Sequence, residues 1–110
     1  MPEISSASVA RLNDMLRTKG VGGEVFATPG ITNLSHTMRG RVLQAIMEFD
    51  DFNEGNNPHG EHDFGAVEID EQKFFFKIDT YDPTYCFMSE DPTNVEKTRR
   101  VMTVMRADEY

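Results

Sequence analysis

Hydrophobic residues recur at helical spacing in two stretches of the chain. The first stripe, Val9, Leu12 and Leu16, follows several serines that can cap a helix and precedes Gly20, which can end it. The second stripe begins near Ser35 and consists of Met38, Val42, Ile46 and Phe49. The sequence therefore predicts an N-terminal helix over about residues 1–20 and a second helix that starts near Ser35.

Two later stretches, residues 64–69 and 73–80, have the alternating pattern of strands. If Asp70-Glu71 forms a two-residue turn, Val67 faces Phe74 and the two runs pair as a hairpin. This register predicts one core face of the hairpin, packed against the helices. The expected core is Val67, Phe74, Phe76 and Ile78 against Val42, Ile46, Val101 and Met105.

Residues 24–28 form a further short β-prone run, which Pro29-Gly30 ends. Asp91 and Pro92 fit the first positions of a final helix that extends to about Ala107. The element order is then α-β-α-β-β-α. It predicts a single α+β domain over residues 1–110, with a small antiparallel sheet of about three strands, a central hairpin and about three helices.

Charge is distributed unevenly. The chain has 19 acidic and 11 basic residues, a net charge of -8, and residues 42–72 contain nine of the acids and neither Lys nor Arg. This composition disfavours direct binding of nucleic acid and favours a protein partner with a basic surface. The expected partner-binding residues are Asp50, Asp51, Glu54, Glu61 and Asp63. A solvated face that only keeps the protein soluble is the alternative.

The chain contains one cysteine, and no apolar run is long enough to span a membrane. Its first residues lack a basic region followed by an apolar one. We therefore expect a cytoplasmic protein without membrane contact, in which Cys86 is a small buried thiol.

Candidate chemistry is concentrated in residues 58–65. Glu61 and His62, with Asp79 expected across the hairpin, could form a general acid–base site in which a carboxylate orients the imidazole. His62 and Asp63 are the candidates for a divalent metal. The structural alternative is that His62 and the neighbouring Asn and Asp side chains bond loop backbone and fix the start of the strand. No cofactor is predicted, apart from that metal as an alternative.

Several motifs resemble those of one bacterial protein family. They are Phe49-Asp50-Asp51-Phe52, Gly60-Glu61-His62-Asp63-Phe64-Gly65, Phe76-Lys77-Ile78-Asp79 and Ser89-Glu90-Asp91-Pro92. The chain is similar over residues 24–110 to the domain-of-unknown-function 3768 family of small chromosomal, plasmid and phage proteins. The resemblance implies no known activity, but it implies a mobile-element setting.

Two hypotheses follow. We expect a non-enzymatic protein-binding module, a mobile-element accessory or anti-defence inhibitor that acts through the acidic 42–72 surface. Its partner would be a protein with a basic groove, such as a nucleic-acid-binding defence complex. The alternative is a small hydrolase or nuclease that uses Glu61, His62 and Asp79, with or without a divalent metal.

Overall fold

The first helix has the caps that its sequence predicts. In the computed structural model, which describes residues 5–110, α1 (Ser6–Lys19) begins after Ser5, whose hydroxyl accepts a hydrogen bond from the Ser8 N–H at 3.3 Å. The helix ends at Gly20, which adopts the left-handed conformation with φ 69°. The hydroxyl of Ser35 caps α3 (His36–Met47) in the same way. The second predicted helix is confirmed, and so is the first over Ser6–Lys19, whereas positions 1–4 of its predicted range lie outside the described residues.

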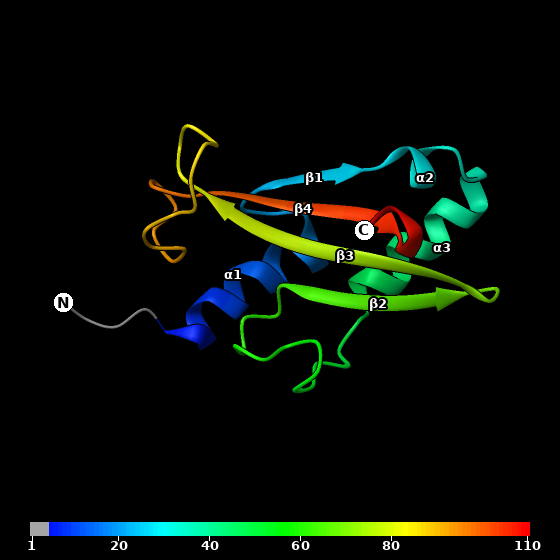
Figure 1. Cartoon of the computed structure of the whole chain (residues 1–110), viewed down its shortest axis with the longest axis horizontal. Coiled ribbons are helices and arrows are strands. Elements are labelled where there is room, and N and C mark those ends of the chain that lie inside the picture. Colours follow the sequence, from blue (N-terminus) through cyan, green and yellow to red (C-terminus); the bar gives the residue numbers. More distant parts are fainter. Residues whose placement is uncertain (1–4) are drawn as a thin grey trace.

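The strands form one mixed sheet (Figure 1). Its order is β1-β4-β3-β2, with β1 parallel to β4 and the other pairs antiparallel. The strand bounds are β1 (Glu24–Ala27), β2 (Phe64–Ile69), β3 (Gln72–Tyr81) and β4 (Arg99–Arg106). The α+β class is confirmed, whereas the predicted three antiparallel strands become four in a mixed sheet. A four-residue helix that was not predicted, α2 (Pro29–Thr32), follows β1.

The hairpin register is as predicted. Val67 pairs with Phe74, and Asp70 and Glu71 connect β2 to β3. Both turn residues have positive φ, 51° and 66°, as a two-residue hairpin turn requires. The guanidinium of Arg41 binds Asp70 at 2.7 Å, and this hydrogen bond lowers the pKa of the Asp70 carboxyl.

The predicted final helix over residues 92–107 is wrong. Asp91 caps only a turn, where its carboxylate accepts the Thr93 N–H, and residues from Arg99 onward form β4. This strand lies between β1 and β3, so its side chains are buried on both faces of the sheet. A strand buried on both faces is a nearly continuous apolar run, which has no period of two to distinguish it from a helix.

The main core lies between the sheet and the helices. Phe74 and Phe76 are fully buried there against Val42 and Ile46 of α3, as predicted. The residues that β4 contributes to this core are Met102 and Val104 rather than the predicted Val101 and Met105, because the strand alternates sides. Val101 and Met105 are buried too, but they lie outside this cluster.

No α-helix of residues 5–110 packs on the second face of the sheet. A 3-10 turn, η1 (Ala107–Glu109), brings the C-terminus back beside β3, where Tyr110 contacts Phe64 and Phe75 (Figure 1). The carboxylate of Glu109 holds this turn by accepting bonds from the Thr28 hydroxyl at 2.7 Å and the Gly30 N–H at 3.0 Å.

Cys86 is exposed, contrary to the prediction of a buried thiol. It lies in the loop between β3 and β4, where the carboxylate of Asp82 accepts its backbone N–H at 3.2 Å. The helices within residues 5–110 are too short and too polar to cross a membrane.

Truncation of Phe76 tests the packing. Phe76→Ala should lower the free energy of unfolding by about 3–5 kcal/mol, because the ring is fully buried among other core side chains. Urea unfolding measures this loss. Phe87→Ala is the control, since that ring is 73% exposed and its removal should leave the midpoint nearly unchanged. Equal effects of the two substitutions would contradict the arrangement.

The stability that the Glu109 carboxylate gives to the C-terminal turn should depend on pH. The Thr28 hydroxyl, then the Arg106 backbone N–H, lower the pKa of Glu109 below its ordinary value of 4.5. Its stabilising contribution is therefore complete above pH 4.5 and is lost as the pH falls through the folded-state value. Thermal unfolding should show Glu109→Gln less stable than the parent at neutral pH and equal to it in acid. Glu96→Gln, at an exposed position, should show no such dependence.

Candidate functional site

Asparagine side chains hold the loop between α3 and β2 in shape. Asn53 Oδ1 accepts the Gly55 N–H, and Asn56 donates to the carbonyl of Asp51, both at 2.9 Å. At the other end of the loop, Asn57 Oδ1 accepts the N–H of His62 at 2.9 Å. Residues 50–63, the acidic loop, therefore have a defined backbone although they form no regular element.

Aromatic rings fasten this loop to the core. Phe52 meets Phe49 edge to face at 4.9 Å, and Phe49 in turn meets Phe76 at 5.4 Å. The imidazole of His62 stacks on Phe52 with parallel planes and centroids 3.9 Å apart. His62 adopts a left-handed backbone with φ 56°, an unusual conformation for a non-glycine residue. The surrounding contacts thus fix both the backbone and the ring of His62.

The carboxylate that orients His62 comes from the first helix. Asp14 Oδ2 lies 3.0 Å from His62 Nδ1, and Asp14 Oδ1 accepts a bond from Arg17 at 2.9 Å. The imidazole is partly exposed, and it lines an open groove with Asp14, Arg11, Thr18 and Lys19. A carboxylate on Nδ1 favours the tautomer in which Nε2 can accept a proton, so the pair has the geometry of a general base.

Two buried polar residues of α1 join the helix to this region. Asn13 donates to the carbonyl of Glu61 at 2.8 Å and accepts a bond from Arg100 at 2.6 Å. Arg17 donates to the carbonyls of Ile46 and Phe49, at 3.0 and 2.8 Å, where α3 ends. The first helix therefore braces the acidic loop at both of its ends.

The predicted partner-binding carboxylates all lie on this loop. They are the side chains of Asp50, Asp51, Glu54, Glu61 and Asp63, and within residues 5–110 none of them forms an ion pair. Of the other acids of residues 42–72, Glu48 follows α3 directly before the loop, and Glu68, Asp70 and Glu71 belong to the hairpin. The hairpin turn is at the far end of β2 from the loop (Figure 1), and Arg41 already neutralises its Asp70. The acidic third of the sequence is thus two separate surfaces.

The predicted catalytic residues do not all come together. Glu61 and His62 are adjacent, but Asp79 pairs with Lys77 at 3.3 Å, while His62 contacts Asp14. The expected His62–Asp79 pair is absent because β2 begins only at Phe64, and His62 turns back toward α1. The part of the chain that the structure describes contains no cluster of three or more His, Cys, Asp or Glu side chains suited to a metal ion.

A comparison with known protein families shows to which family the chain belongs. The sequence model described as a protein of unknown function, DUF3768, matches residues 27–109. The chain belongs to the DUF3768 family. The DUF3768 match includes His62, the acidic loop, α3 and strands β2 to β4, but α1 with Asp14 lies before it. No curated protein and no solved structure matches the chain.

Sequence reasoning missed Asn13, Asp14 and Arg17 as parts of the site. One signal was present: Asn13 and Arg17 are four residues apart and share a helical face with Val9 and Leu16. Polar residues in an apolar stripe need partners when they are buried. The pattern could not show that those partners are backbone carbonyls of a distant loop.

Removal of the hydrogen bond between Asn57 and His62 should increase the local mobility of the acidic loop around His62. Asn57→Ala leaves the His62 N–H without its acceptor and should cost about 1 kcal/mol of stability. Amide exchange should accelerate at His62 and at neighbouring loop residues. Asn33→Ala, at an exposed position, is the matched control and should leave these rates unchanged. Unaltered exchange at His62 in Asn57→Ala would contradict this role.

Proposed function

We propose that this DUF3768 protein is a non-enzymatic binding module whose acidic loop docks on a basic surface of a protein partner. The observation that carries the proposal is the set of five loop carboxylates without an ion-pair partner within residues 5–110. Acids that stabilise a fold are usually paired or hydrogen-bonded, as Asp70 is by Arg41. As far as residues 5–110 are concerned, these five carboxylates are open to interactions with a partner.

The rigidity of the loop supports the same proposal. Association normally loses part of its favourable energy to the ordering of loops and side chains. Here the loop backbone is already held by Asn53, Asn56 and Asn57, and Phe52 anchors it to the core. A preformed array of carboxylates can thus meet a complementary basic array at a small entropic cost.

The chemistry of the loop selects the class of partner. Nucleic acid would be repelled, whereas a protein with a groove lined by Lys and Arg would be attracted over a distance set by the ionic strength. Such grooves are typical of nucleic-acid-binding proteins. The proposed biological role is an accessory or anti-defence inhibitor that occupies such a groove, and it rests on the mobile-element setting that the family resemblance implies.

Charge reversal on the loop tests the proposal. The triple variant Asp50→Lys, Asp51→Lys and Glu54→Lys should weaken partner binding at least tenfold, since binding depends on these charges. Affinity capture from host lysate with mass spectrometry, at low and high salt, identifies the partner first. The fold should be unaffected, because exposed loop charges contribute little to stability.

The matched control makes the same change in net charge elsewhere. Glu71, Glu90 and Glu96 are exposed residues outside the acidic loop, and their reversal to Lys should leave partner binding intact. Equal loss in both triple variants would show that only the net charge matters. Full binding by the loop variant would refute the docking role.

A second candidate function, a small hydrolase or nuclease, is favoured by the contact between Asp14 and His62 Nδ1. Within residues 5–110 His62 has no hydrogen bond to a serine, threonine or cysteine. As a general base, His62 would therefore activate a water molecule rather than a side-chain nucleophile. Glu61 adjoins it in sequence, whereas Asp79 is paired with Lys77. This function would use the groove beside α1 rather than the exposed loop carboxylates.

The two candidate functions respond to different substitutions. His62→Gln and Asp14→Asn should each abolish hydrolysis of phosphodiester or ester substrates, measured with and without added Mg²⁺, Mn²⁺ or Zn²⁺, if the groove is catalytic. The same variants should still bind the partner if the acidic loop is the functional surface. Hydrolysis that survives both substitutions would refute the dyad as a catalytic base.

A further inference from the structure

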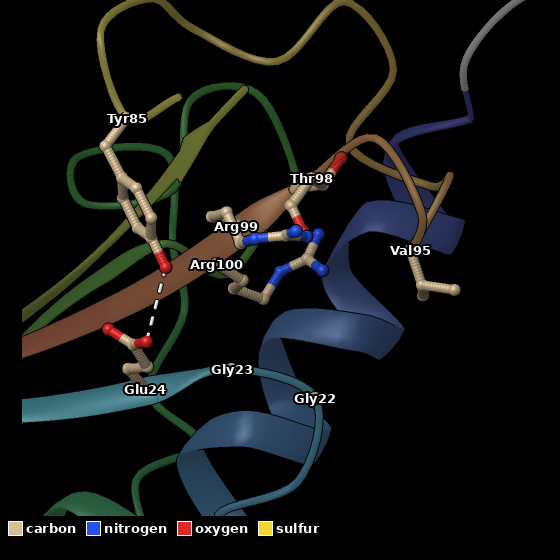
Figure 2. A pocket seen from close by; sticks show the side chains of 8 residues that line it. All are labelled: Gly22, Gly23, Glu24, Tyr85, Val95, Thr98, Arg99 and Arg100. Atoms are coloured by element: carbon tan, nitrogen blue, oxygen red, sulfur yellow. Dashed lines mark hydrogen bonds between the residues drawn. The ribbon is translucent and has the colours of Figure 1, made fainter. Parts of the chain in front are cut away.

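A cavity lies at the end of the sheet where β4 begins. It has a volume of about 370 Å³ and opens between the residues that lead into β1, the start of β4 and the loop before β4 (Figure 2). This volume is within the range of small-molecule sites. We call it the arginine pocket, after Arg99 and Arg100. Its other lining residues are Gly22, Gly23, Glu24, Tyr85, Val95 and Thr98.

Arg100 is a buried cation without a counter-ion. Its side chain is 3% exposed, and its bonds go to neutral acceptors, Asn13 Oδ1 and the Pro92 carbonyl, both at 2.6 Å. Burial lowers the pKa of the Arg100 guanidinium. A buried charge that no opposite charge compensates is costly, so this position favours an anion brought from outside.

One nitrogen of this guanidinium is available to a ligand. Within residues 5–110 Arg100 Nη1 donates no hydrogen bond, whereas Nε and Nη2 both do. The one side-chain atom of those residues that is fully buried without a partner is Arg17 Nε. Arg100 Nη1 is therefore within reach of solvent, which is consistent with the place of Arg100 in the pocket wall.

Arg99 adds a second positive charge to the pocket. It is exposed, forms no ion pair within residues 5–110, and makes only a 3.5 Å contact with the Thr98 carbonyl. Both arginines belong to the residues that line the pocket (Figure 2). Two arginines carry a charge of +2, which matches a phosphate monoester better than a carboxylate, and guanidinium groups bind phosphate oxygens in bidentate geometry.

The rest of the pocket suits a hydroxylated, planar body attached to that phosphate. Tyr85 has a left-handed backbone with φ 61°, and its hydroxyl donates to Glu24 at 3.2 Å, so its ring is held at the pocket wall (Figure 2). A half-exposed tyrosine ring can stack on a base, and a carboxylate can accept a sugar hydroxyl.

Two glycines, Gly22 and Gly23, form part of the pocket wall. A Cβ atom at Gly23 would collide with the Arg100 carbonyl and with the Leu16 side chain, and Gly22 has φ 90°. The backbone at Gly23 can approach β4 closely because this residue has no side chain, and glycine at position 22 permits the positive φ there.

We propose that the arginine pocket binds a nucleoside monophosphate. Arg99 and Arg100 hold its phosphate, Glu24 accepts a hydroxyl of its sugar, and the ring of Tyr85 stacks on its base. This inference is independent of the acidic loop, because the pocket shares none of the five loop carboxylates.

Calorimetric titration of the full chain with adenosine monophosphate, adenosine and inorganic phosphate tests the proposal. Adenosine monophosphate should bind saturably, inorganic phosphate should compete with it more weakly, and adenosine should bind at least tenfold more weakly. Arg99→Ala should weaken the monophosphate at least tenfold, while Tyr85→Leu should weaken the monophosphate and leave inorganic phosphate unchanged.

The matched control is Lys97→Ala, which removes an exposed positive charge close in sequence but outside the pocket lining. It should change the affinity less than twofold. No saturable binding of the monophosphate at millimolar concentration would overturn the proposal, as would equal losses in Arg99→Ala and Lys97→Ala. Phosphate binding as tight as that of the monophosphate, with Tyr85→Leu without effect, would overturn the nucleoside part.

Discussion

A buried guanidinium on the first helix holds together the elements from which the candidate sites are built. Arg17 bonds three carbonyls where α3 ends, those of Ile46, Met47 and Phe49, and also the carboxylate of Asp14. The end of a helix carries partial negative charge, so a cation there is stabilised although it is buried. The guanidinium also lies over the Phe52 ring, with its carbon 5.3 Å from the centroid. Helix α3, the acidic loop and α1 therefore meet at one side chain.

The same helix reaches both candidate sites. Asp14 contacts His62 beside the acidic loop, and Asn13 contacts Arg100 in the wall of the arginine pocket. Asn13 also bonds the Glu61 carbonyl, so one buried amide connects the loop to β4. Helix α1 lies before residues 27–109, which the DUF3768 model matches.

The two sites have opposite charge within a protein whose net charge is -8. Within residues 5–110 the carboxylates of the acidic loop form no ion pair. The guanidinium groups of the arginine pocket form none either. Within residues 5–110 no ion pair joins the two sites directly. We therefore propose a different kind of ligand for each site, a basic protein surface for the loop and an anion for the pocket.

The sequence by itself determined the local elements whose signals are contained in neighbouring residues. Ser5 and Gly20 bound α1, Ser35 begins α3, and the turn at Asp70-Glu71 fixes the pairing of Val67 with Phe74. The acidic character of residues 50–63 also required no structure. In each case the determining interaction spans a few residues, or a hairpin that one turn closes.

Only the tertiary structure decided the rest. Residues 99–106 became a strand because β1 and β3 pair with both of their edges, a contact that the local apolar pattern does not contain. His62 turned to Asp14 rather than to Asp79 because α1 lies against the loop, 48 residues away in sequence. Arg100 became buried in the pocket wall through its bond to Asn13, a partner 87 residues distant in sequence. Such contacts depend on how whole elements pack. The sequence around each residue therefore does not indicate which distant residue it will contact.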